Sequence, residues 1–135
     1  EMSNRLVDGL LLRGDFINIL FKRKRNWEDQ KSLSPFIRPG IEEVFLSPNK
    51  LRLSNMVFIF LNQKSAAILE GLANGVPSLI VKETEVDDYL ELDEDCFPSF
   101  SVERTLEHLD NFKCRENIRR LHNYQFRWAE RHTFG

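Results

Sequence analysis

One segment, LNQKSAAILEGLANGVPSLIV (Leu61–Val81), constrains the fold of this chain more than any other. A small-residue helical stretch over 64–74 stops at Asn74-Gly75, and glycine commonly follows a helix because it accepts a left-handed backbone. Pro77 then fixes the chain as it enters a short apolar run, which is typical of a buried strand. The segment therefore predicts a helix followed directly by a strand.

Apolar runs of strand length recur along the chain and alternate with helical segments. We predict strands over 16–21, 44–46, 56–61 and 77–81, and a final short one near Phe97. We predict helices over about 3–12, 64–74, 101–112 and 114–132. This alternation predicts an α/β fold, a Rossmann-like three-layer domain with a mostly parallel sheet of about four or five strands.

Composition and charge exclude several classes of protein. The 135 residues are 41% hydrophobic and 30% charged, as in a soluble domain with one core. The net charge of −2 argues against a polyanion-binding chain, and no apolar run approaches the roughly 20 residues that span a bilayer. Cys96 and Cys114 lack metal-ligand spacing, so we predict free thiols in a reducing, cytoplasmic compartment.

Polar residues gather where the predicted strand 56–61 gives way to the next helix. Ligands of a parallel sheet bind beyond the carboxyl ends of its strands, and a helix start offers unpaired N–H groups to a phosphate. Asn62, Lys64 and Ser65 stand at this point. Ser65 would add a hydroxyl donor and Lys64 a positive charge. Glu70, five residues after Ser65, would accept hydrogen bonds from vicinal hydroxyls such as those of ribose.

A purely structural interpretation of the same residues remains open. Ser65 or Asn62 would then cap the helix, and Glu70 would be a solvated helix residue. The residues alone favour this interpretation slightly, because there is no Gly-rich phosphate loop. In either interpretation, four small residues keep the helix thin so that it packs closely on the sheet: Ala66, Ala67, Gly71 and Ala73.

The run SAAILEGLANGVPSLIV (65–81) resembles the C-terminal nucleotide-sugar-binding domain of GT-B fold glycosyltransferases. In that domain a strand is followed, in order, by a turn that contains a Ser, a helix that carries a Glu, a Gly-x-Pro motif and another strand. LRLSNMVFIF, INILFKRK and the closing helices resemble its flanking parts, so the resemblance covers about 15–130. Nucleotide-sugar epimerases of the same fold share the pattern. The resemblance implies that Ser65 contacts the donor phosphate and Glu70 the ribose.

The chain departs from this family pattern at two places. Lys64 stands where many relatives have a second Ser or a Gly. Lys22-Arg23-Lys24-Arg25 follows the first strand, where several relatives have a His-Pro pair. Lys22 and Lys24 would bind donor phosphates, an anionic acceptor or an anionic inner-membrane surface; the alternative is a solvated loop that keeps the sheet edge soluble. No nucleic-acid-binding motif accompanies them, so no nucleic-acid partner is expected.

The resemblance implies that residues 1–135 form a single donor-binding domain, the C-terminal half of a longer two-domain glycosyltransferase of polysaccharide or lipopolysaccharide biosynthesis. Its partners would be a nucleotide sugar and an N-terminal domain or partner subunit, with no metal or other cofactor required by this domain. The sequence identifies no catalytic residue, and the chain alone is expected to be inactive. The alternatives are an epimerase-like domain and a non-catalytic partner or regulatory module.

Two other features are interpreted as structural. The acidic tract 83–95 is predicted to be a solvated loop with a helical turn at 87–90, although Glu83 or Asp87 could meet a sugar hydroxyl. His108 and His122 are predicted to be surface or partly packed helix residues, and no histidine shows metal-ligand spacing. In the last helix one stripe is shared by Ile118, Leu121, Gln125 and Trp128.

Overall fold

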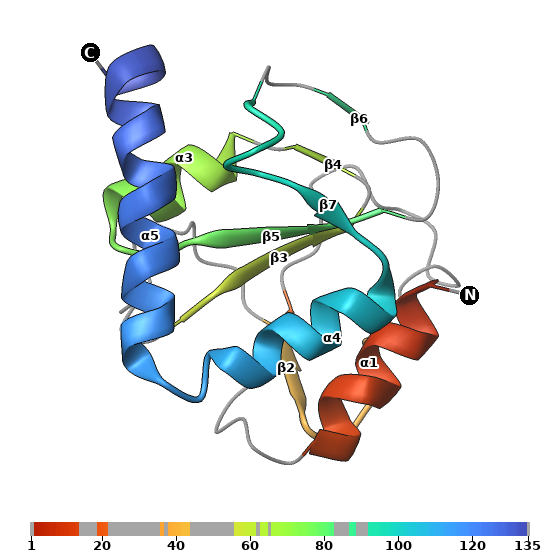
Figure 1. The fold of residues 1–135 in the computed structure, drawn as a ribbon. Helices are drawn as coiled ribbons and strands as arrows, with labels where there is room; N and C mark the ends of the chain where they lie inside the picture. The colour runs from red at the N-terminus through yellow and green to blue at the C-terminus, as the bar shows by residue number, and fades with distance from the viewer. Residues whose placement is uncertain are drawn as a thin grey trace. The chain divides into compact units, whose positions relative to one another are not determined.

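The computed structural model divides the chain into two compact units, Glu1–Leu46 and Ser47–Gly135. Its described residues are 2–13, 19–21, 36, 38–43, 56–61, 63–64, 66–82, 87–88 and 92–134. The described elements are four α-helices, a closing π-helical turn and short strands, and every strand pair is parallel (Figure 1). The described chain is therefore an α/β protein.

The first unit contains one helix and one parallel strand pair. Helix α1 (Met2–Arg13) buries Leu6 and Val7. Strands β1 (Ile19–Phe21) and β2 (Ile41–Glu43) pair in register from Ile19 opposite Ile41. A salt bridge of 2.6 Å between Arg38 and Asp8 ties the turn before β2 to α1.

The second unit contains a parallel sheet of three strands in the order β3-β5-β7. These strands are β3 (Phe58–Leu61), β5 (Ser78–Val81) and β7 (Ser99–Phe100). All four residues of the central strand β5 are buried, as the apolar run after Pro77 predicts. A separate two-residue pair joins β4 (Gln63–Lys64) to β6 (Asp87–Asp88).

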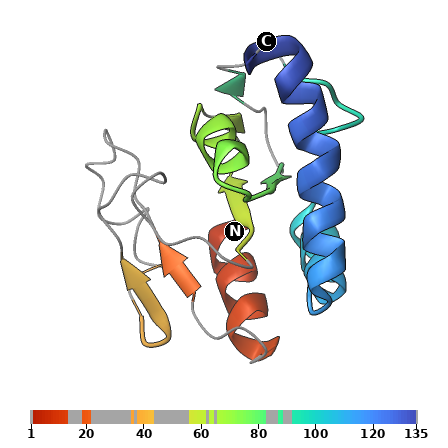
Figure 2. The ribbon, with the colours of Figure 1, turned by 90° about the vertical axis from the view of Figure 1, so that its left-hand side faces the viewer.

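Helices cover both faces of this three-stranded sheet. Figures 1 and 2 show α3 (Ala67–Ala73) on one face and α4 (Val102–Asn111) on the other, while α5 (Arg115–Ala129) crosses beside the start of β5. The π-helix η3 (Glu130–Phe134) continues α5. The buried core joins α3, β5, the turn before β7 and α5, through Ile68, Leu72, Ile80, Leu92, Cys96, Phe97 and Ala129.

Gln125 completes the edge of β5 where β7 does not reach it. β7 pairs with β5 only at Ile80 and Val81, which leaves the Ser78 backbone unpaired on that side. The Gln125 side-chain oxygen accepts from the Ser78 N–H at 3.0 Å, and its amide nitrogen donates to the carbonyls of Ser78 at 2.9 Å and Cys96 at 3.0 Å. With 1% of its surface exposed, Gln125 acts as a buried substitute for a neighbouring strand.

Several predicted elements are confirmed, and others shift or are wrong. The helices near 3–12 and 101–112 and the strand at 78–81 form as predicted, and Ser101 caps α4 by accepting from the Arg104 N–H at 3.2 Å. The predicted helical turn at 87–90 is wrong, because Asp87 and Asp88 form β6. The predicted strand at 16–21 is confirmed over Ile19–Phe21, which is β1, and its residues 16–18 lie outside the described residues. The predicted strand at 44–46 also lies outside them, and the described strand that precedes it is β2.

Candidate functional site

The carboxyl ends of three parallel strands meet at one edge of the second unit's sheet. Leu61 of β3 pairs with Val81 of β5, and Val81 pairs with Phe100 of β7. The three strands therefore end level with one another. Because ligands of parallel sheets bind beyond this edge, the segments that leave it form the candidate site.

The segments that follow β3 and β5 run side by side beyond this edge. The chain passes from β3 into β4, and β4 pairs in parallel with β6, which follows β5. The register places Gln63 opposite Asp87 and Lys64 opposite Asp88. The acidic tract thus borders the predicted donor-binding segment, and a basic and an acidic residue occupy paired positions there.

The helix after β3 begins later than predicted. We expected it over 64–74, but α3 spans Ala67–Ala73. Gln63 and Lys64 cannot be helical, because their backbone pairs with β6. The residue before the helix is Ala66, which has helical dihedral angles and provides no side-chain cap. Ser65 and Asn62 lie outside the described residues, so the capping alternative stays a prediction.

Glu70 lies on the first turn of α3, with its side chain exposed. The Asn74 side-chain amide donates to the backbone carbonyl of Glu70 at 2.8 Å, so this contact does not involve the Glu70 carboxylate. Within the described part of the chain, no hydrogen bond or ion pair engages the carboxylate. Glu70 is therefore placed to accept hydrogen bonds from a ligand.

Gly71 brings α3 close to the sheet, as the small-residue pattern predicts. A Cβ atom at this position would lie 2.7 Å from the Phe58 ring of β3. Ala66 and Ala73 are exposed, so the close approach depends on Gly71 and not on every small residue of the helix. Gly75 adopts a φ of 86° after the helix, which confirms the predicted left-handed position.

The remaining predicted donor-binding residues cannot be placed. Asn62, Ser65, Lys22 and Lys24 lie outside the described residues. Lys64 is described as part of β4 through its backbone only. Of the six predicted site residues, Glu70 is thus the one whose side chain the structure places.

Lys82 is a candidate that the sequence reasoning missed. It is the first residue after β5, and its N–H donates to the Phe100 carbonyl at 2.7 Å, which fixes its position between the ends of β5 and β7. Its side chain is exposed and has no acidic partner among the residues that the structure describes. The sequence signal that could have identified Lys82 is a basic residue directly after an apolar strand, because the same pattern identified Lys22 as a candidate.

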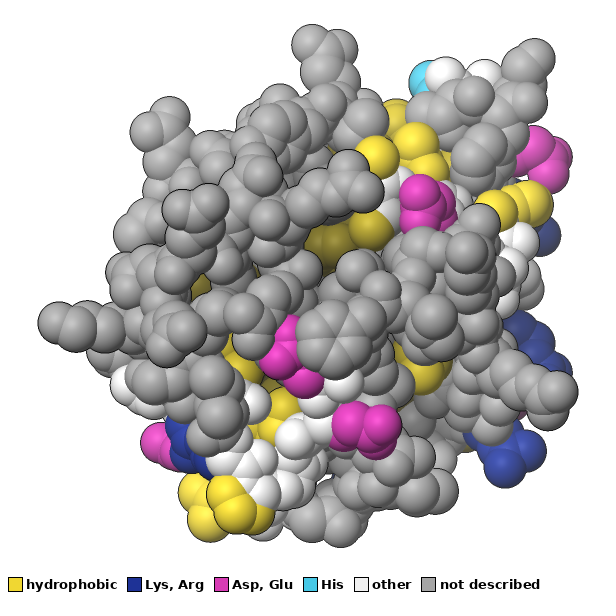
Figure 3. All heavy atoms as spheres, turned by 180° about the vertical axis from the view of Figure 1, so that it is seen from behind, with side chains coloured by type: hydrophobic (Ala, Val, Ile, Leu, Met, Phe, Trp, Pro, Cys, Tyr) yellow, Lys and Arg dark blue, Asp and Glu magenta, His cyan; other side chains and the backbone are white. Residues whose placement is uncertain are grey.

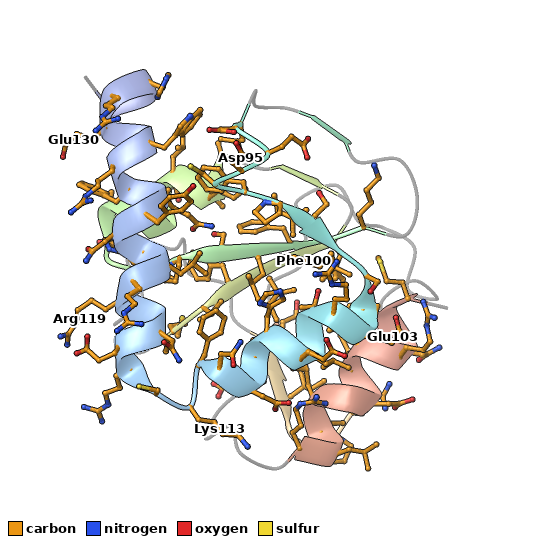
Figure 4. The ribbon with its side chains drawn as sticks, in the orientation of Figure 1. Asp95, Phe100, Glu103, Lys113, Arg119 and Glu130 are labelled. Atoms are coloured by element: carbon orange, nitrogen blue, oxygen red, sulfur yellow. The ribbon has the colours of Figure 1, made fainter. Side chains whose placement is uncertain are left out.

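Arg104 lies near the same edge, at the start of α4. Its guanidinium carbon stands 5.6 Å from the centre of the Phe100 ring, a cation–π arrangement. Phe100 is the last residue of β7, and its ring also contacts His108 of α4, with ring centres 4.3 Å apart (Figure 4). Arg104 and Lys82 therefore place positive charge near the carboxyl ends of β7 and β5.

The cysteines and histidines have structural surroundings. Both cysteines are free, as predicted. Burial and then the nearby carboxylate of Asp93 raise the pKa of the Cys96 thiol, which favours its protonated, less nucleophilic form. His122 contacts the Leu72 carbonyl at 2.8 Å and is partly packed, as is His108. Within the described ranges, no three potential ligands gather to hold a metal.

Comparison with known proteins identifies no relative. No family model, no curated protein and no solved structure matches this chain. Among the described residues, no helix combines the length and the apolar character needed to cross a bilayer.

Proposed function

We propose that this chain is the donor-binding domain of a glycosyltransferase and that it binds the nucleotide of an activated sugar. The observation that carries the proposal is the exposed carboxylate of Glu70 on the helix that follows β3, which no hydrogen bond or ion pair engages among the described residues. Lys82, the first residue after β5, adds an exposed positive charge beyond the strand ends. The β3–α3–β5 unit supports it, because this is the strand–helix–strand order of a Rossmann-like donor domain and the sequence resemblance centres on it.

Side chains would carry most of the charge recognition in this site. Helix α3 has only seven residues, so its dipole contributes less than that of a longer helix would. Lys82 would supply positive charge to a diphosphate, together with the predicted contribution of Ser65. Glu70 would accept hydrogen bonds from ribose hydroxyls. As the glycosidic bond breaks, the positive charge would stabilise the phosphate leaving group.

The proposal is tested by titrating the protein with UDP, CMP and GDP while following backbone amide signals by NMR. One of the nucleotides should shift signals of Glu70 and Lys82 at millimolar concentration. Glu70→Ala should weaken binding by roughly tenfold or more, the value of a hydrogen bond to a charged group, without lowering the melting temperature. Lys82→Gln should weaken binding of the nucleoside diphosphate more than that of the free nucleoside.

Matched controls are Glu107→Ala and Lys113→Gln, which remove the same charges at exposed positions away from this edge. Binding should be unchanged in both. A folded protein that shows no shift with any nucleotide would refute the proposal and favour the non-catalytic module. A large loss of stability in Glu70→Ala would instead assign that residue a structural role.

A further inference from the structure

Helix α5 and its continuation η3 present a line of arginines to solvent. Arg120, Arg127 and Arg131 are exposed, and Tyr124 between them has 53% of its surface exposed. The four residues are separated by four, three and four positions. Because an α-helix has 3.6 residues per turn, this spacing places them along one side of the helix. These three arginines and Tyr124 are called the arginine ridge below.

The arginines of the ridge have no partner within the described part of the chain. No hydrogen bond or ion pair engages Arg120, Arg127 or Arg131 there. By contrast, Arg119, which is off the ridge, pairs with Glu116 at 3.1 Å. The helix beneath the ridge is anchored by buried Ile118, Gln125 and Ala129. The ridge is thus a row of guanidinium groups on an anchored helix, and no other described residue engages their donors.

The ridge dominates the charge of its end of the chain. Residues 113–134 carry six Lys and Arg against two Glu, a net charge of +4, although the whole chain has −2. The other residues must therefore sum to −6. Seen from behind, Lys and Arg side chains lie along the margin that α5 occupies (Figure 3). Positive charge is concentrated here on an otherwise acidic chain.

Acidic side chains lie on both flanks of helix α5, which carries the ridge. Glu130, like Arg119, lies on one flank of α5, and Asp95 lies on the opposite flank (Figure 4). The neighbouring Cys96 thiol and, to a smaller extent, the carboxylates of Asp95 and Asp93 raise the pKa of the Tyr124 hydroxyl, so acidic groups lie near the centre of the ridge. A broad anionic surface, such as a bilayer, would press its charges against both flanks. A narrow acidic segment would meet the ridge and avoid the flanks.

We propose that the arginine ridge docks an acidic helical segment of a partner protein, whose three carboxylates are separated by seven and four positions, as Arg120, Arg127 and Arg131 are. Each carboxylate would meet one guanidinium group, and Tyr124 would supply apolar contact at the centre of the interface. This surface lies on α5, and its use does not depend on nucleotide binding at the strand ends.

The test uses a fluorescein-labelled, alanine-based helical peptide of roughly 16 residues, long enough to form a helix, with Glu at that spacing. A scrambled peptide of equal charge is the comparison. The patterned peptide should bind about tenfold tighter than the scrambled one in fluorescence anisotropy at low salt. The triple variant Arg120→Gln/Arg127→Gln/Arg131→Gln should bind it about tenfold more weakly than the wild-type protein does.

The matched control Lys113→Gln/Arg115→Gln/Arg119→Gln removes the same charge from exposed positions off the ridge, and should change the affinity less than about twofold. Circular dichroism checks that both variants fold. Equal losses in the two variants, equal binding of the two peptides, or no binding at about 1 mM peptide would overturn the proposal. Ridge-dependent binding to phosphatidylglycerol vesicles that exceeds binding to the peptide would overturn it in favour of a membrane.

Discussion

Replacing Gln125 with leucine should lower the free energy of unfolding by about 4 kcal/mol. Leucine occupies a similar volume but leaves three buried backbone groups without partners: the Ser78 N–H and the carbonyls of Ser78 and Cys96. Each stranded group costs about 1–3 kcal/mol, so the three together cost roughly 6 kcal/mol. Burial of the apolar leucine side chain returns about 2 kcal/mol.

The change is measured by urea unfolding followed by far-ultraviolet circular dichroism. With a slope of about 2 kcal/mol per molar urea, the midpoint should fall by about 2 M. Leu121→Met, a volume-conserving change on the same helix, is the control and should cost less than about 1.5 kcal/mol. A Gln125→Leu midpoint within about 0.3 M of the wild-type value would refute the view that this amide substitutes for a strand.

Gln125→Glu separates the hydrogen bonds from the shape of the side chain. A carboxylate can still accept from the Ser78 N–H, but it faces the carbonyl oxygens of Ser78 and Cys96. Burial and these oxygens should raise the pKa of the new carboxyl group above about 4.3, its value in an unfolded chain. The native state would then bind the proton more tightly, so this variant should lose stability, relative to wild type, as the pH rises through the folded-state pKa. Unfolding curves measured over roughly pH 5 to pH 8 should show this loss of stability. A difference in unfolding free energy from wild type that stays constant with pH would contradict it.

Three further changes examine the packing of the second unit. Gly71→Ala should cost about 1–3 kcal/mol in urea unfolding, because the new Cβ would lie 2.7 Å from the Phe58 ring; unchanged stability would show that the ring moves aside easily. Ser78→Ala should leave stability unchanged or raise it by about 1 kcal/mol, because the buried Ser78 hydroxyl has no partner among the described residues, whereas a clear loss would reveal one. Iodoacetamide at mildly alkaline pH should alkylate exposed Cys114 well before Cys96, whose raised pKa and 7% exposure protect it; peptide mapping that finds equal rates would disprove this.

The elements that the sequence predicts correctly are those with a strong local signal. The buried run after Pro77 forms β5, and Ser101 caps α4 through its own side chain. The start of α3 could not be predicted, because Gln63–Lys64 is held in a strand by β6, more than 20 residues away along the chain. Local propensity cannot reveal a partner at that separation.

The candidate site could be predicted only in part, because some of its residues also depend on contacts between distant parts of the chain. The position of Glu70 on the predicted helix makes it a candidate and the family resemblance supports it; the structure places its side chain exposed on α3. Lys82 was passed over because its importance depends on where the neighbouring strands end, which only the pairing of Val81 with Phe100 defines. The sequence places Gln125 on one stripe of the last helix with Ile118, but its role depends on how short β7 is.

The use of a side chain in place of a strand has a consequence for how the protein is made. Gln125 is synthesised 47 residues after Ser78, so the first part of β5 emerges from the ribosome long before its edge can be covered. An uncovered strand edge is a template for pairing with other chains, and contacts between distant residues form late in folding. A nascent chain that stalls before α5 is complete should therefore be the form of this protein most prone to aggregate.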